Sequence, residues 1–220
     1  TRLSIGGYGE VHYNQPFDKD IRKNGIADVH RMVMLLGYNF NSTTQFISEI
    51  EFEHVSEVYI EQAFLQHKIN NFIQFRAGLL LIPMGIINEY HEPTTFNGVE
   101  RPLTDQKLSP TTWREIGFGF AGTILPAQLK YQLYLVNGFK SYDGKGFLNG
   151  KDGLRGGRQK GAESFISSPD FTTRIEYFGI SGLTLGMSGY TGRTESNLYN
   201  AIDKMNKAAV SVADSSVVGI

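Results

Sequence analysis

Residues 129–136 read Leu-Lys-Tyr-Gln-Leu-Tyr-Leu-Val, with an apolar or aromatic side chain at each of positions 129, 131, 133 and 135. Successive side chains of a β-strand point to opposite faces of the sheet, so this period of two predicts a strand with one apolar face. Eight further segments alternate in the same way, although segments 29–40 and 58–69 place apolar residues on both faces. A tenth strand is expected to begin at residues 217–220.

The connections between these segments are alternately short and long. The short ones lie near residues 41–43, 70–71, 125–127 and 181–182, and a tight turn near residues 55–57 is the exception to the alternation. The long ones cover roughly residues 14–28, 83–113, 139–170 and 193–216. Outer-membrane barrels have short periplasmic turns and long external loops. We therefore predict an all-β fold, an antiparallel up-and-down transmembrane β-barrel, in one incomplete domain over residues 1–220.

The composition excludes several other classes of protein. Of the 220 residues, 40% are hydrophobic and 12% aromatic, and the formal net charge is -1. That balance gives no reason to expect nucleic acid as a partner. Cys is absent, so neither disulfides nor thiol chemistry are expected. The longest apolar run, residues 77–87, contains Gly78, Pro83 and Gly85 and is too short for a spanning helix, which needs about 20 residues.

Six short motifs follow one another in the middle of the chain. They are Glu61-Gln62-Ala63-Phe64, Phe75-Arg76-Ala77-Gly78, Ile82-Pro83-Met84-Gly85, Val99-Glu100-Arg101-Pro102, Trp113-Arg114-Glu115-Ile116-Gly117 and Tyr134-Leu135-Val136-Asn137-Gly138. In this order they resemble the family of phosphate-selective porins O and P and its porin-like relatives. Similar segments occur in that family where a strand enters the long third loop and where the neighbouring strands begin and end.

The resemblance implies a trimer of sixteen-stranded barrels in the outer membrane of a Gram-negative bacterium, and this chain would be roughly the first half of one barrel. It also implies a passive channel through the lipid bilayer for small hydrophilic solutes or ions. Phosphate selectivity needs cations in the lumen, because Arg and Lys replace the water that an anion loses. The run of Glu49, Glu51 and Glu53 departs from that requirement, so we carry over the pore and not the phosphate.

Charged residues on the expected polar faces are the candidates for the pore wall. They are Glu49, Glu51, Glu53, Arg76, Lys130, Arg174 and Glu176. The connection over residues 83–113 is too long for a plain turn, and we expect it to fold into the barrel and narrow it. Its candidate constriction residues are Glu89, Glu92, Glu100, Arg101 and Arg114. The carboxylates predict a mixed or mildly cation-leaning selectivity.

Other interpretations of the same residues stay open. The three glutamates could form the solvated face of an ordinary sheet, and the long connection could be an external cap or a contact between copies. The protein could be a non-conducting barrel or a surface-exposed β-protein with a binding or structural role in an envelope complex. We do not expect an enzyme, because none of the five His residues lies in a recognisable nucleophile motif. No cofactor or metal site is expected, and Glu-Tyr-His-Glu at residues 89–92 lacks a recognised ligand spacing.

Overall fold

A computed structural model of the protein describes residues 2–92, 95, 98, 101–107, 109–142 and 145–220. Nine strands pair in series into one sheet, and all neighbours are antiparallel. These strands are β1 (Leu3–Asn14), β2 (Ile26–Asn39), β3 (Thr44–Glu53), β4 (Glu57–Lys68), β5 (Gln74–Leu81), β6 (Arg114–Ile124), β7 (Leu129–Val136), β9 (Asp170–Ile180) and β10 (Leu183–Thr191). β7 pairs directly with β9, because β8 (Lys140–Tyr142) belongs to a second, smaller sheet.

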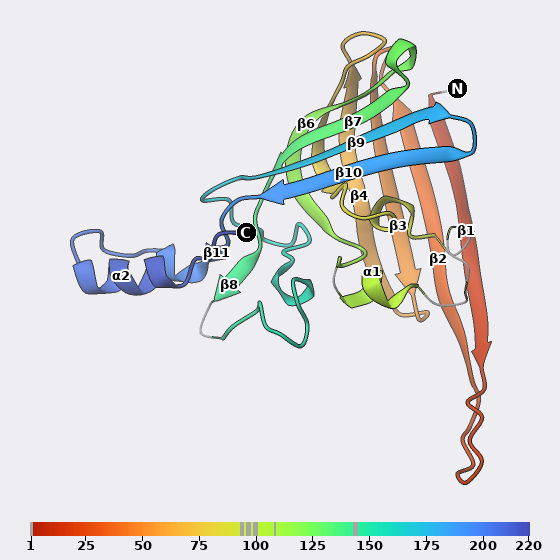
Figure 1. Ribbon diagram of the computed structural model, residues 1–220, viewed down its shortest axis with the longest axis horizontal. Coiled ribbons are helices and arrows are strands. Elements are labelled where there is room, and N and C mark those ends of the chain that lie inside the picture. Colours follow the sequence, from red (N-terminus) through yellow and green to blue (C-terminus); the bar gives the residue numbers. More distant parts are fainter. Residues whose placement is uncertain (1, 93–94, 96–97, 99–100, 108, 143–144) are drawn as a thin grey trace.

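The nine-stranded sheet is strongly curled. In Figure 1, β1 stands nearly upright, whereas β10 runs almost across the view. Within the described residues β1 and β10 are both edge strands with no pairing between them, so the sheet is an open, incomplete barrel. The predicted all-β, antiparallel up-and-down fold is confirmed, and the number of strands in the large sheet lies at the lower end of the expectation.

Helices contribute little to the described part of the chain. α1 (Leu103–Lys107) and α2 (Lys207–Ser215) are short, and single 3-10 turns occur at Asn88–Tyr90, Leu125–Ala127, Arg155–Gly157 and Asn197–Tyr199. None of the helices in this part is long and apolar enough to cross a membrane. β8 pairs with β11 (Glu195–Ser196) in a two-stranded parallel sheet.

The prediction that a tenth strand begins at residues 217–220 is wrong. The preceding Ala-rich segment forms α2 instead, with the side chain of Asn206 accepting a hydrogen bond from the backbone N–H of Ala209 at its start. After this helix the chain returns to the end of β10, where Gly219 makes an isolated bridge with Arg193. Two backbone hydrogen bonds of 3.1 Å also join Gly192 and Ile220, so the final residues fasten a loop and do not extend the sheet.

The two faces of the large sheet differ in chemistry. On β7, Leu133 and Leu135 are 37% and 39% exposed, while Gln132 and Tyr134 between them are 3% and 1% exposed. The exposed, apolar side is called the outer face below, and the side that carries Gln132 is called the inner face. Exposed apolar or aromatic residues cover the outer face of the neighbouring strands as well. Examples are Ile116, Phe118, Phe120, Ile175, Tyr177 and Leu185.

Two bulges change the order in which side chains reach the inner face. In β2, Arg31 pairs with Glu10 and Val29 with Val11, which leaves His30 as the additional residue. In β4, Glu61 is the additional residue opposite β3. A bulge turns two consecutive side chains toward the same side. Each bulge shifts the alternation by one residue, which explains why Val29 and Ile60 are exposed on the outer face, whereas Val33 and Phe64 are apolar residues of the inner face itself.

The apolar core gathers where the long connections leave the sheet. The ring of Trp113 stacks on that of Phe139, with centroids 4.7 Å apart, and Tyr190 lies 4.9 Å from Trp113. The buried core residues are Phe64, Leu80, Ile82, Trp113, Ala121, Tyr134, Val136 and Phe139. This core fixes the base of the segment between β5 and β6, which carries the predicted constriction residues.

Candidate pore wall and inner loop

The segment from residue 82 to residue 113, called the inner loop below, is closed at its base by one buried side chain. Ile82 N–H donates to the carbonyl of Trp113 at 2.9 Å. The amide of Asn88 donates to the carbonyls of Ile82 and Trp113 at 2.7 and 2.9 Å, and its oxygen accepts from the N–H of Trp113 at 2.9 Å. Asn88 is 1% exposed. Its three bonds hold the two ends of the loop together.

From this base the inner loop contacts the inner face of β7 and β9. Glu89 accepts a hydrogen bond of 2.5 Å from Gln132, and its other oxygen lies 3.8 Å from Arg174. Lys130 donates to the hydroxyl of Tyr90 at 2.7 Å. Arg174 also donates to the carbonyl of Gly85 at 2.5 Å. The loop is therefore fastened to the sheet through the polar side chains predicted for the pore wall.

The opposite side of the inner loop faces β3 and β4 through His91. Its Nδ1 lies 2.9 Å from the carbonyl of Asn88, an acceptor, so Nδ1 carries the proton. Burial, with the nearby charge of Arg101, lowers the pKa of His91 to about 4. Neutral His91 lies with Glu51 and Glu61 in a buried group whose ligand atoms are all within 4.8 Å of one another. Two carboxylates and an imidazole are ligands that zinc or iron accepts.

Arg31 organises the charged cluster on β1, β2 and β3. Its Nε donates to Glu10 at 3.0 Å and its Nη1 donates to Glu51 at 2.8 Å, while its Nη2 lies 4.0 Å from Glu53. The Arg31 side chain is only 3% exposed. Two of the three glutamates predicted for the pore wall therefore face a buried cation that sequence reasoning missed. The sequence feature that could have indicated this cation is Arg31, an isolated basic residue in segment 29–40, which has apolar residues on both faces.

The remaining predicted wall residues also have polar partners on the inner face. Glu49 accepts from the amide of Gln62 at 2.7 Å. Arg76 donates to Gln66 at 2.8 Å and to the hydroxyl of Tyr134 at 3.1 Å. Elsewhere, Arg174 pairs with Glu176 at 2.5 Å, and Lys130 lies 3.5 Å from the same carboxylate. The structure brings Arg76, Glu89 and Lys130 together around one cavity of about 190 Å³.

A second cavity, of about 200 Å³, is mainly basic. Its charged lining consists of Glu53, Glu61, Arg101, Arg114, Arg155, Arg158 and Lys160. Arg114 pairs with Glu61 at 2.5 Å, and Arg158 donates to the carbonyl of Thr111 at 2.6 Å. Burial, together with the charge of Arg155, lowers the pKa of Arg158 to about 10, so this side chain stays cationic at neutral pH. The surplus of guanidinium groups suits a small anion.

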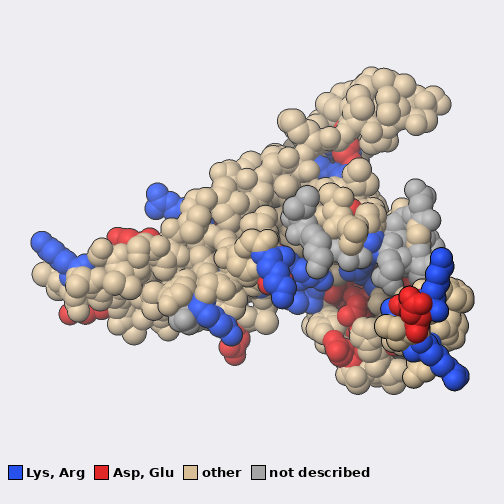
Figure 2. Space-filling model, turned by 60° about the horizontal axis from the view of Figure 1, so that its bottom comes forward, with Lys and Arg blue, Asp and Glu red and all other residues tan. Residues whose placement is uncertain are grey.

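The structure thus distributes the predicted constriction residues over several places. Glu89 contacts β7 and β9, while Arg101 and Arg114 line the basic cavity. Glu92 is half-buried in the inner loop, and Glu100 lies outside the described residues. Figure 2 shows Lys and Arg side chains next to Asp and Glu side chains around the centre and lower right of the view, with further charged side chains at the left end and mostly uncharged surface between them. Whether these residues line a conducting path stays a prediction.

Comparison with known proteins gives one close relative in sequence. An uncharacterized protein of Aquifex aeolicus (strain VF5) is 37% identical over 212 residues, which is 90% of this chain and 47% of that protein. The chain therefore spans about half the length of this relative. No family model matches, so the resemblance to porins O and P rests on the motifs alone.

Two solved structures of an outer membrane protein of Vibrio cholerae are distantly similar. OmpT with loop L8 deleted is 12% identical, with a TM-score of 0.36, over 88% of this chain and 70% of that one. The trimer form of in-vitro folded OmpT is 14% identical, with a TM-score of 0.35, over 88% and 66%. At these values the likeness says nothing further about this chain.

Proposed function

We propose that this chain forms part of the wall of an outer-membrane porin, a passive diffusion channel for small hydrophilic solutes or ions. One observation carries the proposal. A polar loop, residues 82–113, is fastened to the polar inner face of a curled up-and-down sheet whose other face is apolar and exposed. A barrel with lipid outside and water inside requires this distribution of polarity.

The outer face supports a membrane environment. A water-soluble sheet normally covers its apolar face with a second layer. Here Phe118 and Phe120 on β6 are 50% and 44% exposed, and Leu185 on β10 is 53% exposed. In lipid, the unpaired edges of β1 and β10 would each leave backbone groups without partners. We therefore propose that further strands close the barrel. The resemblance to porins O and P implies about sixteen strands in all and a homotrimer of closed barrels, and both belong to this proposal.

The inner face supports a polar passage of mixed charge. Glu49, Glu51 and Glu53 lie along one strand, but Arg31 compensates part of their charge. The basic cavity around Arg158 adds positive potential near the inner loop. Opposed charges along a narrow path favour small hydrophilic solutes over apolar ones and give weak selectivity between ions. Catalysis has no part in this proposal.

Conductance of the full-length protein in a planar lipid bilayer tests the proposal. We expect stepwise conductance under a salt gradient. The triple variant Glu49→Gln/Glu51→Gln/Glu53→Gln should shift the reversal potential toward anion preference, because the field of the carboxylates is felt within about 8 Å at physiological salt. Glu163→Gln, in an exposed loop position, is the matched control and should leave the reversal potential unchanged.

Two results would count against this function. A reversal potential that does not move in the triple variant would place the three carboxylates away from the conducting path. A correctly folded protein without any conductance would instead favour a non-conducting barrel with a structural or binding role in the envelope.

A further inference from the structure

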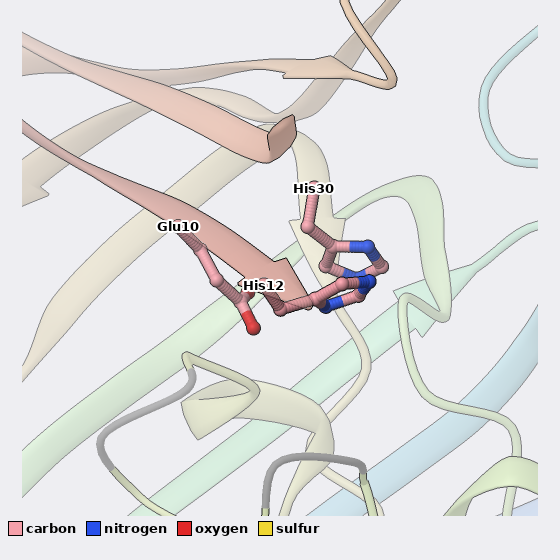
Figure 3. Close-up of side chains that lie close together, drawn as sticks. All are labelled: Glu10, His12 and His30. Carbon is pink, nitrogen blue, oxygen red and sulfur yellow. The ribbon is translucent and has the colours of Figure 1, made fainter. Parts of the chain in front are cut away.

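Three of the five histidines of the chain meet at the long-loop end of the first three strands. His12 comes from β1 and His30 from β2, and His54 follows directly after β3. The ring centroids of His12 and His30 are 4.6 Å apart, and those of His30 and His54 are 5.3 Å apart. Figure 3 shows the rings of His12 and His30 lying against each other, with Glu10 projecting from the strand that carries His12.

All three rings direct a nitrogen toward the same carboxylate oxygen. Oδ2 of Asp28 lies 2.7 Å from Nδ1 of His54, 3.4 Å from Nδ1 of His30 and 3.8 Å from Nε2 of His12. Each carboxylate oxygen has about two lone-pair positions, so it cannot accept a hydrogen bond from all three rings at once. Only His54 and His30 lie within hydrogen-bond distance of this oxygen, and the nitrogen of His12 lies just beyond it, so three imidazole nitrogens gather around one carboxylate.

Local backbone geometry builds this convergence. Asp28 and His30, two residues apart on β2, share the inner face by the alternation of the strand, and the bulge at His30 brings the next residue, Arg31, to the same face. His54 and Val55 both have left-handed backbone conformations, with φ of 49° and 69°, as in the tight turns of β-hairpins. The turn is fastened to β2 by a 3.3 Å bond from the N–H of His54 to the carbonyl of His30. It places the ring of His54 on Asp28.

We propose that His12, His30, His54 and Asp28 form a binding site for one divalent transition-metal ion of the zinc, nickel or copper class. Neutral imidazole nitrogen is the ligand that these ions prefer, and a carboxylate completes many such sites. The ligand atoms of Asp28, His30 and His54 already lie within 4.8 Å of one another. Ligands at about 2.1 Å from a tetrahedral zinc ion are about 3.4 Å apart, so small side-chain rotations close the set.

Asp28 is a better ligand than its acidic neighbour. Glu10 also lies near His12 and His30, but it already accepts a 3.0 Å hydrogen bond from Arg31. The second guanidinium bond of Arg31 goes to Glu51 at 2.8 Å, so carboxylates on both sides compensate its positive charge. Among the described residues, Asp28 contacts no Arg or Lys, and its charge is available to an incoming cation.

The site is also open enough for an ion to enter. The side chains of His12, Asp28 and His30 are 18%, 21% and 23% exposed, and that of His54 is 47% exposed. Nε2 of His12 is the ring nitrogen that lies near Asp28, at 3.8 Å, and its Nδ1 is buried without a hydrogen-bond partner in the described part of the chain. A bound ion would link β1, β2 and the β3–β4 turn. This inference stands whether or not the barrel conducts.

Titration calorimetry on the full-length protein, folded in detergent and freed of metal with a chelator, tests the site. We expect Zn²⁺ to bind, with Ca²⁺ and Mg²⁺ unable to compete because both prefer oxygen ligands. The double variant His30→Ala/His54→Ala should bind Zn²⁺ at least about ten-fold more weakly. His67→Ala is the matched control, because His67 lies at the far end of β4 against Thr44, and its affinity should equal that of the wild type.

A spectroscopic measurement covers the case in which the double variant does not fold. Co²⁺ bound to the wild-type protein should give the visible absorption of a nitrogen-ligated ion, and Asp28→Asn should shift that band. Absence of Zn²⁺ binding by the wild type, equal affinity in a folded double variant, or a Co²⁺ spectrum unaltered by Asp28→Asn would each overturn the proposal.

Discussion

At the scale of single residues, Arg31 and His91 limit the cost of buried charge on the inner face of the sheet. Arg31 supplies the cation that compensates the charges of Glu10 and Glu51 on the inner face of the sheet. His91 contributes a neutral ring where a charged one would face Arg101. Both are buried, at 3% and 5% exposure, and the removal of either one should be measurable.

Replacement of Arg31 by Met should strongly destabilise the protein. The change leaves two carboxylates without their cation in a buried position, and breaking a buried ion pair in this way costs about 3–5 kcal/mol. Urea unfolding of the protein in lipid vesicles measures the loss. Arg22→Met, in the exposed β1–β2 loop, is the control and should change the free energy of unfolding little. A loss for Arg31→Met no larger than for the control would contradict the buried-cluster interpretation.

His91 should make stability depend on pH in a defined window. In the unfolded chain His91 takes up a proton below its ordinary pKa of 6.5, whereas in the folded protein it resists protonation down to about 4. The unfolded state therefore binds more protons between these values. The stability that this gives is complete above pH 6.5 and is lost as the pH falls toward 4. The loss amounts to about 3 kcal/mol at most.

The variant His91→Gln isolates this contribution, because an amide can still donate to the carbonyl of Asn88 and does not titrate. Unfolding free energies of both proteins between pH 4 and pH 7 make the comparison. Other groups nearby, including Glu51 and Glu61, titrate in both proteins and cancel to first order. We expect a shallower pH profile in the variant, and parallel profiles would show that His91 is not held neutral.

At the scale of elements, the sequence predicted the strands well where the chain alternates regularly, as in β7. It could not orient β4, where a bulge at Glu61 interrupts the period of two, and in β2, which has another bulge at His30, it showed apolar residues on both faces. A bulge depends on pairing with a neighbouring strand, which local alternation does not report. For the same reason the sequence predicted that the carboxylates of β3 share one face, but it did not predict the hydrogen bonds from Arg31 on β2 to Glu10 and Glu51 on the neighbouring strands. Helix α2 was missed because a long loop was expected there.

In the channel that we propose, the inner loop is the element that narrows the passage. Replacement of Asn88 by Ala removes three hydrogen bonds at its base and leaves the buried N–H of Trp113 without its acceptor, whereas the carbonyls of Trp113 and Ile82 keep the N–H groups of Ile82 and Met84. Each buried group left unsatisfied costs about 1–3 kcal/mol. We expect faster proteolytic cleavage within residues 82–113 and a larger single-channel conductance. Asn24→Ala, in an exposed loop, should alter neither, and an equally resistant loop in Asn88→Ala would refute the anchoring role.

At the scale of the whole molecule, the described residues form an open, curled sheet whose two faces suit two different surroundings, one apolar and one polar. The outer face carries large exposed apolar residues, and the inner face carries paired charges and the inner loop. The edges β1 and β10 are unpaired with each other in the described residues. The all-β fold could be predicted from the sequence because the alternation within each strand and the length of each connection are visible in short stretches of the chain. Closure, assembly and selectivity depend on surfaces that one sequence pattern does not describe.

Cysteine accessibility tests the division into a lipid face and a water face most directly. The chain has no Cys, so single substitutions report without background. Lys130→Cys and Ser188→Cys place a thiol on the inner face of β7 and β10, and Leu133→Cys and Leu185→Cys place one on the outer face of the same strands. In vesicles containing the full-length protein, a charged, membrane-impermeant thiol reagent should modify the first pair rapidly and the second pair hardly at all. If Leu133→Cys and Leu185→Cys were modified as fast as Lys130→Cys and Ser188→Cys, the result would contradict a membrane-facing outer surface.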